Sequence, residues 1–201
     1  MSSPAHRESD EQRQTAPGRP RTGPPEQTYR SRSLLVGWPG ILNRMQAPRL
    51  ILICGLPASG KSTLARRLAE ELPAIRLDKD SWVATLGGDV WDDEFRVRVE
   101  SQLWELTRQL LSQGVTVILE WGHWARVERD EKRIAARKLG VQVELHYLSA
   151  PLEDLLRRSD ARTARGEWTA APITREHFAE WVTIFQAPDE DEMRLFDPPA
   201  R

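Results

Sequence analysis

Short apolar runs alternate with amphipathic segments from Arg49 onward, and this alternation predicts the fold. Apolar runs of about four to eight residues are typical of buried parallel strands, whereas apolar residues at helical spacing are typical of helices that pack on one face. Parallel strands with helices on both faces give this alternation, so the sequence predicts an α/β fold. The expected strands cover 50–54, 74–77, 115–119 and 141–148, and the expected helices cover 63–72, 92–112, 126–139, 151–162 and 174–185.

The two ends of the chain differ in composition from its middle. Residues 1–33 contain almost no apolar side chain, and seven of the 14 prolines fall within 1–48. Such a stretch cannot bury enough apolar surface to offset the entropy that is lost on ordering. We therefore expect a disordered extension over 1–48, one globular domain over 49–187, and a frayed, acidic and proline-rich tail over 188–201.

Charge and cysteine content narrow the class of protein. The chain carries 29 basic and 30 acidic residues, so no long-range field attracts duplex nucleic acid or an anionic membrane. No apolar run reaches the roughly 18 residues of a membrane span. Cys54 is the single cysteine, and its place at the end of an apolar strand favours a packed side chain over a nucleophile. We expect a cytoplasmic protein for which membranes are excluded and nucleic acid is disfavoured as a partner.

A glycine-rich run stands between the first expected strand and the first expected helix. Strand, loop and helix follow one another in the order that a phosphate-binding loop requires. Two glycines let the backbone bring its N–H groups to the phosphates, Lys61 reaches the β- and γ-phosphates, and the Ser62 hydroxyl can ligate Mg²⁺. The sequence thus predicts a nucleoside triphosphate site formed by Gly55, Leu56, Pro57, Ala58, Ser59, Gly60, Lys61, Ser62 and Thr63.

Acidic residues follow the second expected strand, at the edge where open parallel sheets bind ligands. Asp80 is the candidate general base, because phosphate transfer to a hydroxyl needs a carboxylate that orients and deprotonates the acceptor. Asp80 could instead cap a helix over 81–86, and Asp78 could take either role. If the strand continued through them, their spacing would place both carboxylates on one face.

Glu120 closes the third expected strand, where P-loop proteins place the acidic residue that holds Mg²⁺ directly or through water. Its alternative role is to cap the loop that follows. Trp121, His123 and Trp124 come next and, with Trp82, could wall an acceptor pocket, although packing in the core is the alternative for each tryptophan. No second His or Cys lies at ligand spacing from His123, which disfavours a metal-binding role.

Arginines gather in the segment 152–168. Arg158 and Arg162 are four residues apart, so on a helix they point to one side and could close together over a triphosphate. A closing lid can bring arginines to the charge that spreads over a transferred phosphoryl group. A solvated helix face is the alternative, since acidic residues lie nearby in the same segment.

With these residues in place, 49–185 resembles the P-loop small kinases near the polynucleotide kinase, zeta-toxin and chloramphenicol phosphotransferase group, often labelled AAA-type ATP-binding proteins. The resemblance implies a Walker A loop over 55–63, ATP and Mg²⁺ as cofactors, Asp80 as the catalytic aspartate, and Arg158 and Arg162 as lid arginines. Two residues depart from the pattern: Val83 stands where polynucleotide kinases carry an arginine, and Glu120 replaces an aspartate. The first departure favours a small-molecule acceptor over a nucleic-acid end.

The leading hypothesis is an ATP-dependent phosphotransferase that acts on a hydroxyl group of a small molecule. The alternatives are an ATP-hydrolysing regulatory or switch protein, and a toxin-like kinase that acts on a nucleotide sugar or a nucleic-acid end. A GTPase is disfavoured because Asn43 is the only asparagine, so the guanine-reading N-K-x-D motif is absent. A ring-forming motor is disfavoured because the expected domain leaves no room for a second helical domain.

Overall fold

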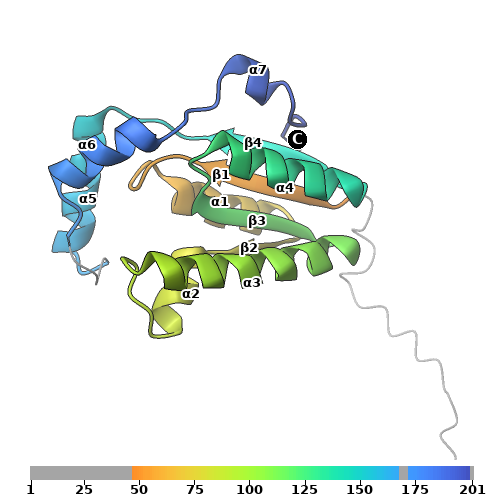
Figure 1. The fold of residues 1–201 in the computed structure, drawn as a ribbon, viewed down its shortest axis with the longest axis horizontal. Coiled ribbons are helices and arrows are strands. Elements are labelled where there is room, and N and C mark those ends of the chain that lie inside the picture. Colours follow the sequence, from red (N-terminus) through yellow and green to blue (C-terminus); the bar gives the residue numbers. More distant parts are fainter. Residues whose placement is uncertain (1–46, 168–171, 200–201) are drawn as a thin grey trace, which may run out of the picture. The chain divides into compact units, whose positions relative to one another are not determined.

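Four parallel strands form the centre of the protein in the computed structural model, which describes residues 47–167 and 172–199. The strands lie in the order β2-β3-β1-β4, and every pair of neighbours is parallel (Figure 1). The predicted α/β fold with a parallel sheet is therefore confirmed. The strands are β1 (Arg49–Cys54), β2 (Ala74–Leu77), β3 (Thr116–Gly122) and β4 (Gln142–Tyr147).

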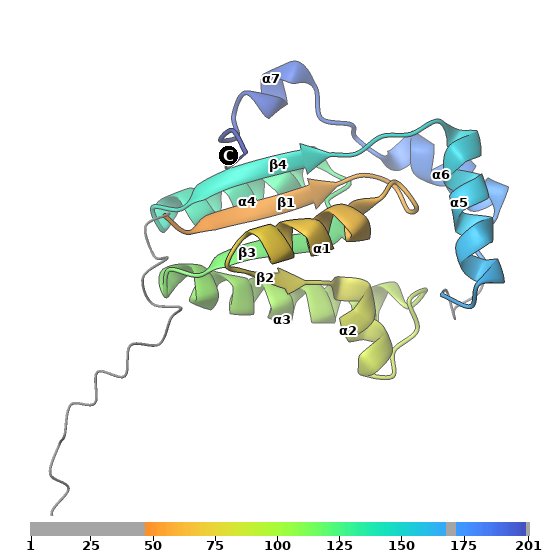
Figure 2. The same cartoon turned by 180° about the vertical axis from the view of Figure 1, so that it is seen from behind.

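Helices cover both faces of this sheet, as a comparison of Figures 1 and 2 shows. Helix α1 (Lys61–Glu71) packs on the face that contains Ile51 and Ile53, whereas α3 (Asp93–Ser112) and α4 (Arg126–Lys138) pack on the face that contains Leu50 and Leu52. Successive strand residues point to opposite faces, so alternate positions of β1 supply two separate cores. The remaining helices are α2 (Lys79–Thr85), α5 (Leu152–Ala164), α6 (Arg175–Ile184) and α7 (Glu190–Met193).

Local signals place the element boundaries within a few residues of those predicted. The Asp92 side chain accepts a hydrogen bond from the Phe95 N–H at 3.0 Å and begins α3, and the Thr174 hydroxyl accepts one from the His177 N–H at 3.4 Å and begins α6. Strand β3 continues to Gly122, beyond the predicted end at residue 119, because the residues that follow are themselves buried.

Two further expectations concern the ends and the cysteine. The predicted disordered extension falls, apart from residues 47 and 48, outside the described residues. Cys54 is buried, and burial raises the pKa of its thiol to about 11, which agrees with a packed side chain. No helix in the described ranges is long and apolar enough to cross a membrane.

The C-terminal segment differs from the predicted frayed tail. Residues 190–193 form α7, and Glu192 is 1% exposed because its carboxylate pairs with the buried Arg129 at 2.6 and 2.8 Å. Phe196 is also buried, and the Asp197 carboxylate accepts a hydrogen bond from the Val143 N–H at 2.7 Å. The acidic composition indicated solvent exposure, but the Glu192 carboxylate has a buried cationic partner, so the segment packs on the domain as far as Asp197.

Candidate active site

The glycine-rich loop lies at the carboxyl end of β1 and has the backbone that its sequence predicts. Gly55 has a φ of 150°, and its N–H donates to the Gly122 carbonyl at 3.1 Å. A Cβ atom at this position would collide with the Leu148 carbonyl oxygen and would lie 2.8 Å from the Ser59 hydroxyl. Gly60 has a φ of 104°, in the left-handed region that favours glycine. The tight turn therefore requires both glycines.

The start of α1 is open to an anion. Gly60 is its N-cap residue, no side chain caps the helix, and the first turn contains no acidic residue. The first N–H groups of a helix have no partner within the helix, and the helix dipole favours negative charge there. The loop and the helix start therefore form a site that fits the phosphates of a nucleotide.

Lys61 lies at the centre of the predicted site. Its ammonium donates a hydrogen bond to the Leu56 carbonyl at 2.8 Å. Burial lowers the pKa of Lys61 to about 8, and the negative charges of Asp80 and Glu120 act against this shift. The Lys61 ammonium thus lies in the loop after β1 and is influenced by two carboxylates, that of Asp80 after β2 and that of Glu120 near the end of β3. Ser62, the next residue of the loop, is half-buried.

The two aspartates after β2 differ in their surroundings. Asp78 is the N-cap of α2: its carboxylate accepts from the Ser81 N–H at 3.3 Å and pairs with Arg76 at 2.6 Å. Asp80 lies in the first turn of α2, is exposed, and makes no hydrogen bond or ion pair within the described part of the chain. The capping role considered for Asp80 is therefore wrong, as is a shared strand face, because β2 ends at Leu77.

Glu120 is 4% exposed, and one of its oxygens accepts a hydrogen bond from the Arg76 guanidinium at 2.5 Å. Arg76 also pairs with Asp78, so it joins the acidic residues of two neighbouring strands. Sequence reasoning missed Arg76. A basic residue inside the apolar run of β2 was the signal that could have found it.

The predicted lid arginines lie beside the phosphate loop. The Arg158 guanidinium donates to the Ala58 carbonyl at 3.5 Å, and the positive charge of Arg162 adds slightly to the lowering of the pKa of Lys61. Their helix, α5, shares a small core with α6, and Leu56 of the phosphate loop packs against it. The core consists of Leu155, Leu156, Ile173 and Phe178.

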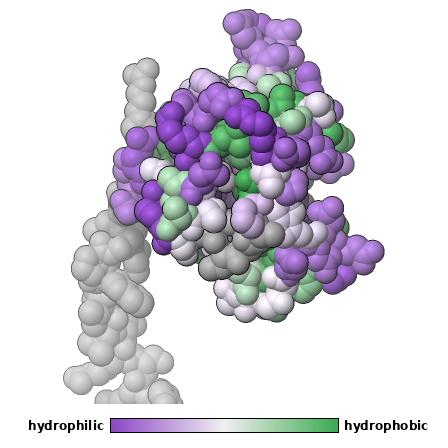
Figure 3. Space-filling model, turned by 90° about the vertical axis from the view of Figure 1, so that its left-hand side faces the viewer, coloured by the Kyte–Doolittle hydropathy of each residue, from purple (hydrophilic) through white to green (hydrophobic). Residues whose placement is uncertain are grey.

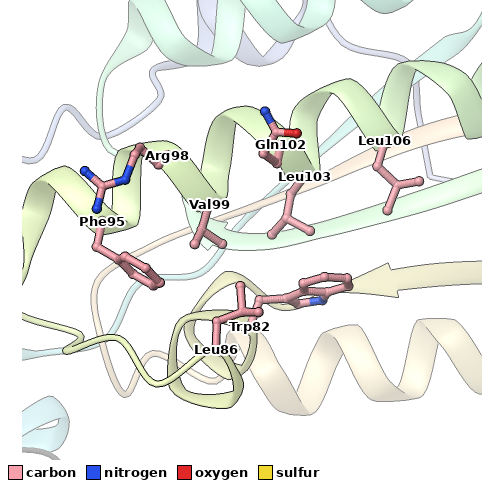
Figure 4. A pocket seen from close by; sticks show the side chains of 8 residues that line it. All are labelled: Trp82, Leu86, Phe95, Arg98, Val99, Gln102, Leu103 and Leu106. Atoms are coloured by element: carbon pink, nitrogen blue, oxygen red, sulfur yellow. The ribbon is translucent and has the colours of Figure 1, made fainter. Parts of the chain in front are cut away.

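The tryptophans singled out by the sequence lie in different surroundings. Trp124 is half-buried and meets Trp181 of α6 edge to face, with ring centroids 5.6 Å apart. Trp121 is 7% exposed and turns toward α3 and α4. Trp82 lines an apolar cavity of about 320 Å³ between α2 and α3, together with side chains such as Phe95 and Leu103 (Figure 4).

Figure 3 views the side of the molecule that is on the left in Figure 1, where hydrophilic surface surrounds a smaller hydrophobic area.

Metal ligands are few in the described residues. Within 47–167 and 172–199, no group of three or more His, Cys, Asp and Glu side chains could hold a metal ion. The Ser62 hydroxyl and the Glu120 carboxylate nonetheless supply oxygen atoms of the kind that Mg²⁺ prefers, and Mg²⁺ in nucleotide sites is held largely by phosphates and water. These residues therefore fit a metal that arrives with a nucleotide.

The comparison with known proteins agrees with this geometry. Residues 50–188 match the AAA domain family. The chain belongs to this family of P-loop kinase-like proteins, which confirms the resemblance drawn from the phosphate loop. Shikimate kinase from Neisseria meningitidis is 33% identical over 120 residues, which cover 58% of this chain and 68% of the enzyme.

Two further relatives extend the likeness. The bifunctional enzyme NodQ from Azospirillum brasilense is 28% identical over 159 residues, which cover 76% of this chain, but the match spans only 25% of NodQ. A chain in the structure of the Pnkp1/Rnl/Hen1 RNA repair complex is 21% identical with a TM-score of 0.62, over 77% of this chain and 48% of that chain. At this identity the structural likeness shows a shared fold.

Proposed function

We propose that the protein is a kinase that transfers the γ-phosphate of ATP to a hydroxyl group of a small molecule. The observation that carries this proposal is the exposed carboxylate of Asp80, which makes no ion pair within the described residues and whose negative charge acts on Lys61 of the phosphate loop. A protein that only binds ATP needs no such base, whereas transfer of phosphate to a hydroxyl group does. The likeness to shikimate kinase also supports a kinase with a small-molecule acceptor.

The phosphate loop holds the donor in this proposal. Backbone N–H groups from 55–63 and the Lys61 ammonium bind the β- and γ-phosphates, and Arg158 and Arg162 close over them from α5. The oxygens of Ser62 and Glu120 would hold Mg²⁺, which when bound neutralises charge on the phosphate oxygens. The ion pair with Arg76 holds the Glu120 carboxylate in place.

Asp80 serves as the base. Its carboxylate accepts the proton of the acceptor hydroxyl as the acceptor oxygen forms a bond to the γ-phosphorus, and the bond from that phosphorus to the bridging oxygen of ADP breaks. Lys61 and the two lid arginines stabilise the charge that develops on the γ-phosphate and on the departing ADP.

Val83 bears on the choice of acceptor. It occupies the position where polynucleotide kinases carry an arginine, and its side chain is fully buried, so it offers a nucleic-acid end no contact. A toxin-like kinase and a regulatory ATPase remain the competing functions, and both need the same phosphate loop.

Asp80→Asn tests this proposal. It should lower phosphate transfer roughly 10²- to 10⁴-fold and leave ATP affinity near that of the wild type, because the amide cannot accept the proton. The matched control is Asp93→Asn, since Asp93 is also an exposed aspartate in the first turn of a helix, α3. Equal turnover of the two variants would contradict the role of Asp80 and favour a regulatory ATPase.

A further inference from the structure

Two buried lysines share one carboxylate between α2, α3 and α4. The Lys79 ammonium donates to one oxygen of Glu100 at 2.9 Å, and the Lys132 ammonium donates to the other at 3.2 Å. Each lysine is only 7% exposed. This group of three side chains, the lysine pair with Glu100, therefore carries one positive charge in excess.

The same group has more hydrogen-bond donors than acceptors. An ammonium group has three N–H donors, and each lysine uses one of them on Glu100 and makes no second hydrogen bond within the described ranges. The Trp121 indole N–H also has no hydrogen-bond partner there, although Trp121 is only 7% exposed.

Two aromatic side chains lie near the lysine pair. The ring centroids of Trp121 and His123 are 5.4 Å apart, and the Lys132 ammonium lies 5.8 Å from the centre of the Trp121 ring. Burial, together with the charges of Lys132 and Lys79, holds the pKa of His123 well below its usual value, so His123 is neutral. The Lys132 ammonium also lies 5.7 Å from the centre of the Trp104 ring, so cation–π attraction offsets part of its charge, but these rings supply no negative charge.

This arrangement stands apart from the phosphate loop. Trp121 belongs to the core on the α3 and α4 face of the sheet, whereas Lys61 begins α1, which covers the opposite face (Figures 1 and 2). Lys79 directly precedes Asp80 at the start of α2. Lys79 therefore links the lysine pair to the helix turn that carries the candidate base, the side on which the acceptor of a kinase lies.

Buried charges are normally balanced by an equal number of opposite charges, and buried polar groups are normally hydrogen-bonded. An oxyanion supplies both the missing negative charge and the missing acceptor atoms. Glu100, with a side chain that is 26% exposed, is the most accessible member of the group.

We propose that Lys79, Lys132 and the Trp121 indole N–H bind a carboxylate or phosphate group of the acceptor, which is therefore a hydroxylated anion. The identification of the ligand as the acceptor rests on the proposed kinase function. The binding of a small oxyanion at the lysine pair rests only on the geometry.

The test is a titration of the full-length protein, without nucleotide, with inorganic phosphate and separately with acetate. The readout is the NMR resonance of the Trp121 indole N–H, identified by its loss in Trp121→Phe. We expect a saturable shift, and the anion that binds more tightly shows whether the ligand group is a phosphate or a carboxylate. The same shift in Lys61→Ala would separate it from phosphate bound at the loop.

Lys132→Met should weaken this binding roughly 10- to 100-fold, because it removes a charge-assisted hydrogen bond. Lys132→Arg should retain most of it. Lys138→Met is the matched control, since Lys138 is an exposed lysine on the same helix, and it should bind as the wild type does. A Trp121 resonance that neither anion moves in the folded wild type, or an equal loss in the Lys132→Met and Lys138→Met variants, would overturn the inference.

The two proposals fail differently. If the protein transfers phosphate but neither anion shifts its Trp121 resonance, the oxyanion site is refuted and the kinase function stands. Saturable binding of an anion by a protein that transfers no phosphate to any acceptor would support the site and refute the kinase function.

Discussion

The buried ion pair between Arg129 and Glu192 joins the C-terminal segment to the loop after β3. Arg129 is 0% exposed, and two of its nitrogens donate to the Glu192 carboxylate at 2.6 and 2.8 Å. A third contact, from its Nη1 to the His123 carbonyl, measures 2.8 Å, and the same nitrogen reaches the Trp124 carbonyl at 3.2 Å. The pair therefore supports the segment that carries two of the candidate site residues.

In Glu192→Ala the Arg129 guanidinium stays buried, but two of its N–H donors lose their acceptor and its positive charge loses its partner. Removing one partner of a buried ion pair costs about 3–5 kcal/mol. In a domain of this size each kcal/mol lowers the melting temperature by about 2–4 °C, so the expected decrease is roughly 6–20 °C. Thermal unfolding followed by circular dichroism measures it.

Glu190→Ala is the control, because Glu190 lies two residues away on α7 and its side chain is 90% exposed in an ion pair with Arg194. This variant should melt within about 2 °C of the wild type. If Glu192→Ala melted as Glu190→Ala does, the buried pair would contribute nothing and the C-terminal segment would not be part of the stable fold.

Three further predictions concern the phosphate loop and the lid. ATP affinity should fall as the pH rises through about 8, because Lys61 in the free protein loses its proton near that pKa and the triphosphate binds the charged form of Lys61. Calorimetry in buffers of different ionisation enthalpy should show that the protein takes up a proton when it binds ATP above pH 8. Binding without proton uptake would contradict the charge state assigned to Lys61. Arg162→Ala should reduce turnover more than ATP affinity, and the loss of turnover should be smaller than the roughly 10³- to 10⁵-fold that arginine fingers contribute. Full turnover in a variant that lacks both Arg158 and Arg162 would exclude the lid. Gly55→Ala should abolish ATP binding, measured by calorimetry, because its Cβ would collide with the Leu148 carbonyl, so normal affinity would contradict the loop geometry.

Local patterns in the sequence were enough to predict the strands, the longer helices and the phosphate loop. The apolar run of β1 and the caps at Asp92 and Thr174 depend on neighbouring residues, which a sequence displays directly. The loop was also predictable, because its glycines and Lys61 are contiguous. Which of Asp78 and Asp80 caps α2 needed the structure, since it depends on where β2 ends and α2 begins.

Contacts between distant residues left no such pattern. Arg129 and Glu192 are 63 positions apart, and Lys132 and Glu100 are 32 apart, so no periodicity links either pair. From the sequence alone, each of these charged residues is expected to be a solvent-exposed side chain on its own helix. Burial by neighbouring elements converts them into ion pairs, and only the fold reveals this.

Transfer of labelled phosphate tests the central claim most directly. The protein is incubated with Mg²⁺, a metabolite extract and ATP that carries ¹⁸O in its γ-phosphate, and the products are followed by mass spectrometry. The account predicts label in a phosphorylated organic acceptor with the wild type and with Asp93→Asn, and a loss of roughly 10²- to 10⁴-fold with Asp80→Asn. Label that appeared only in inorganic phosphate would contradict a kinase and identify an ATPase.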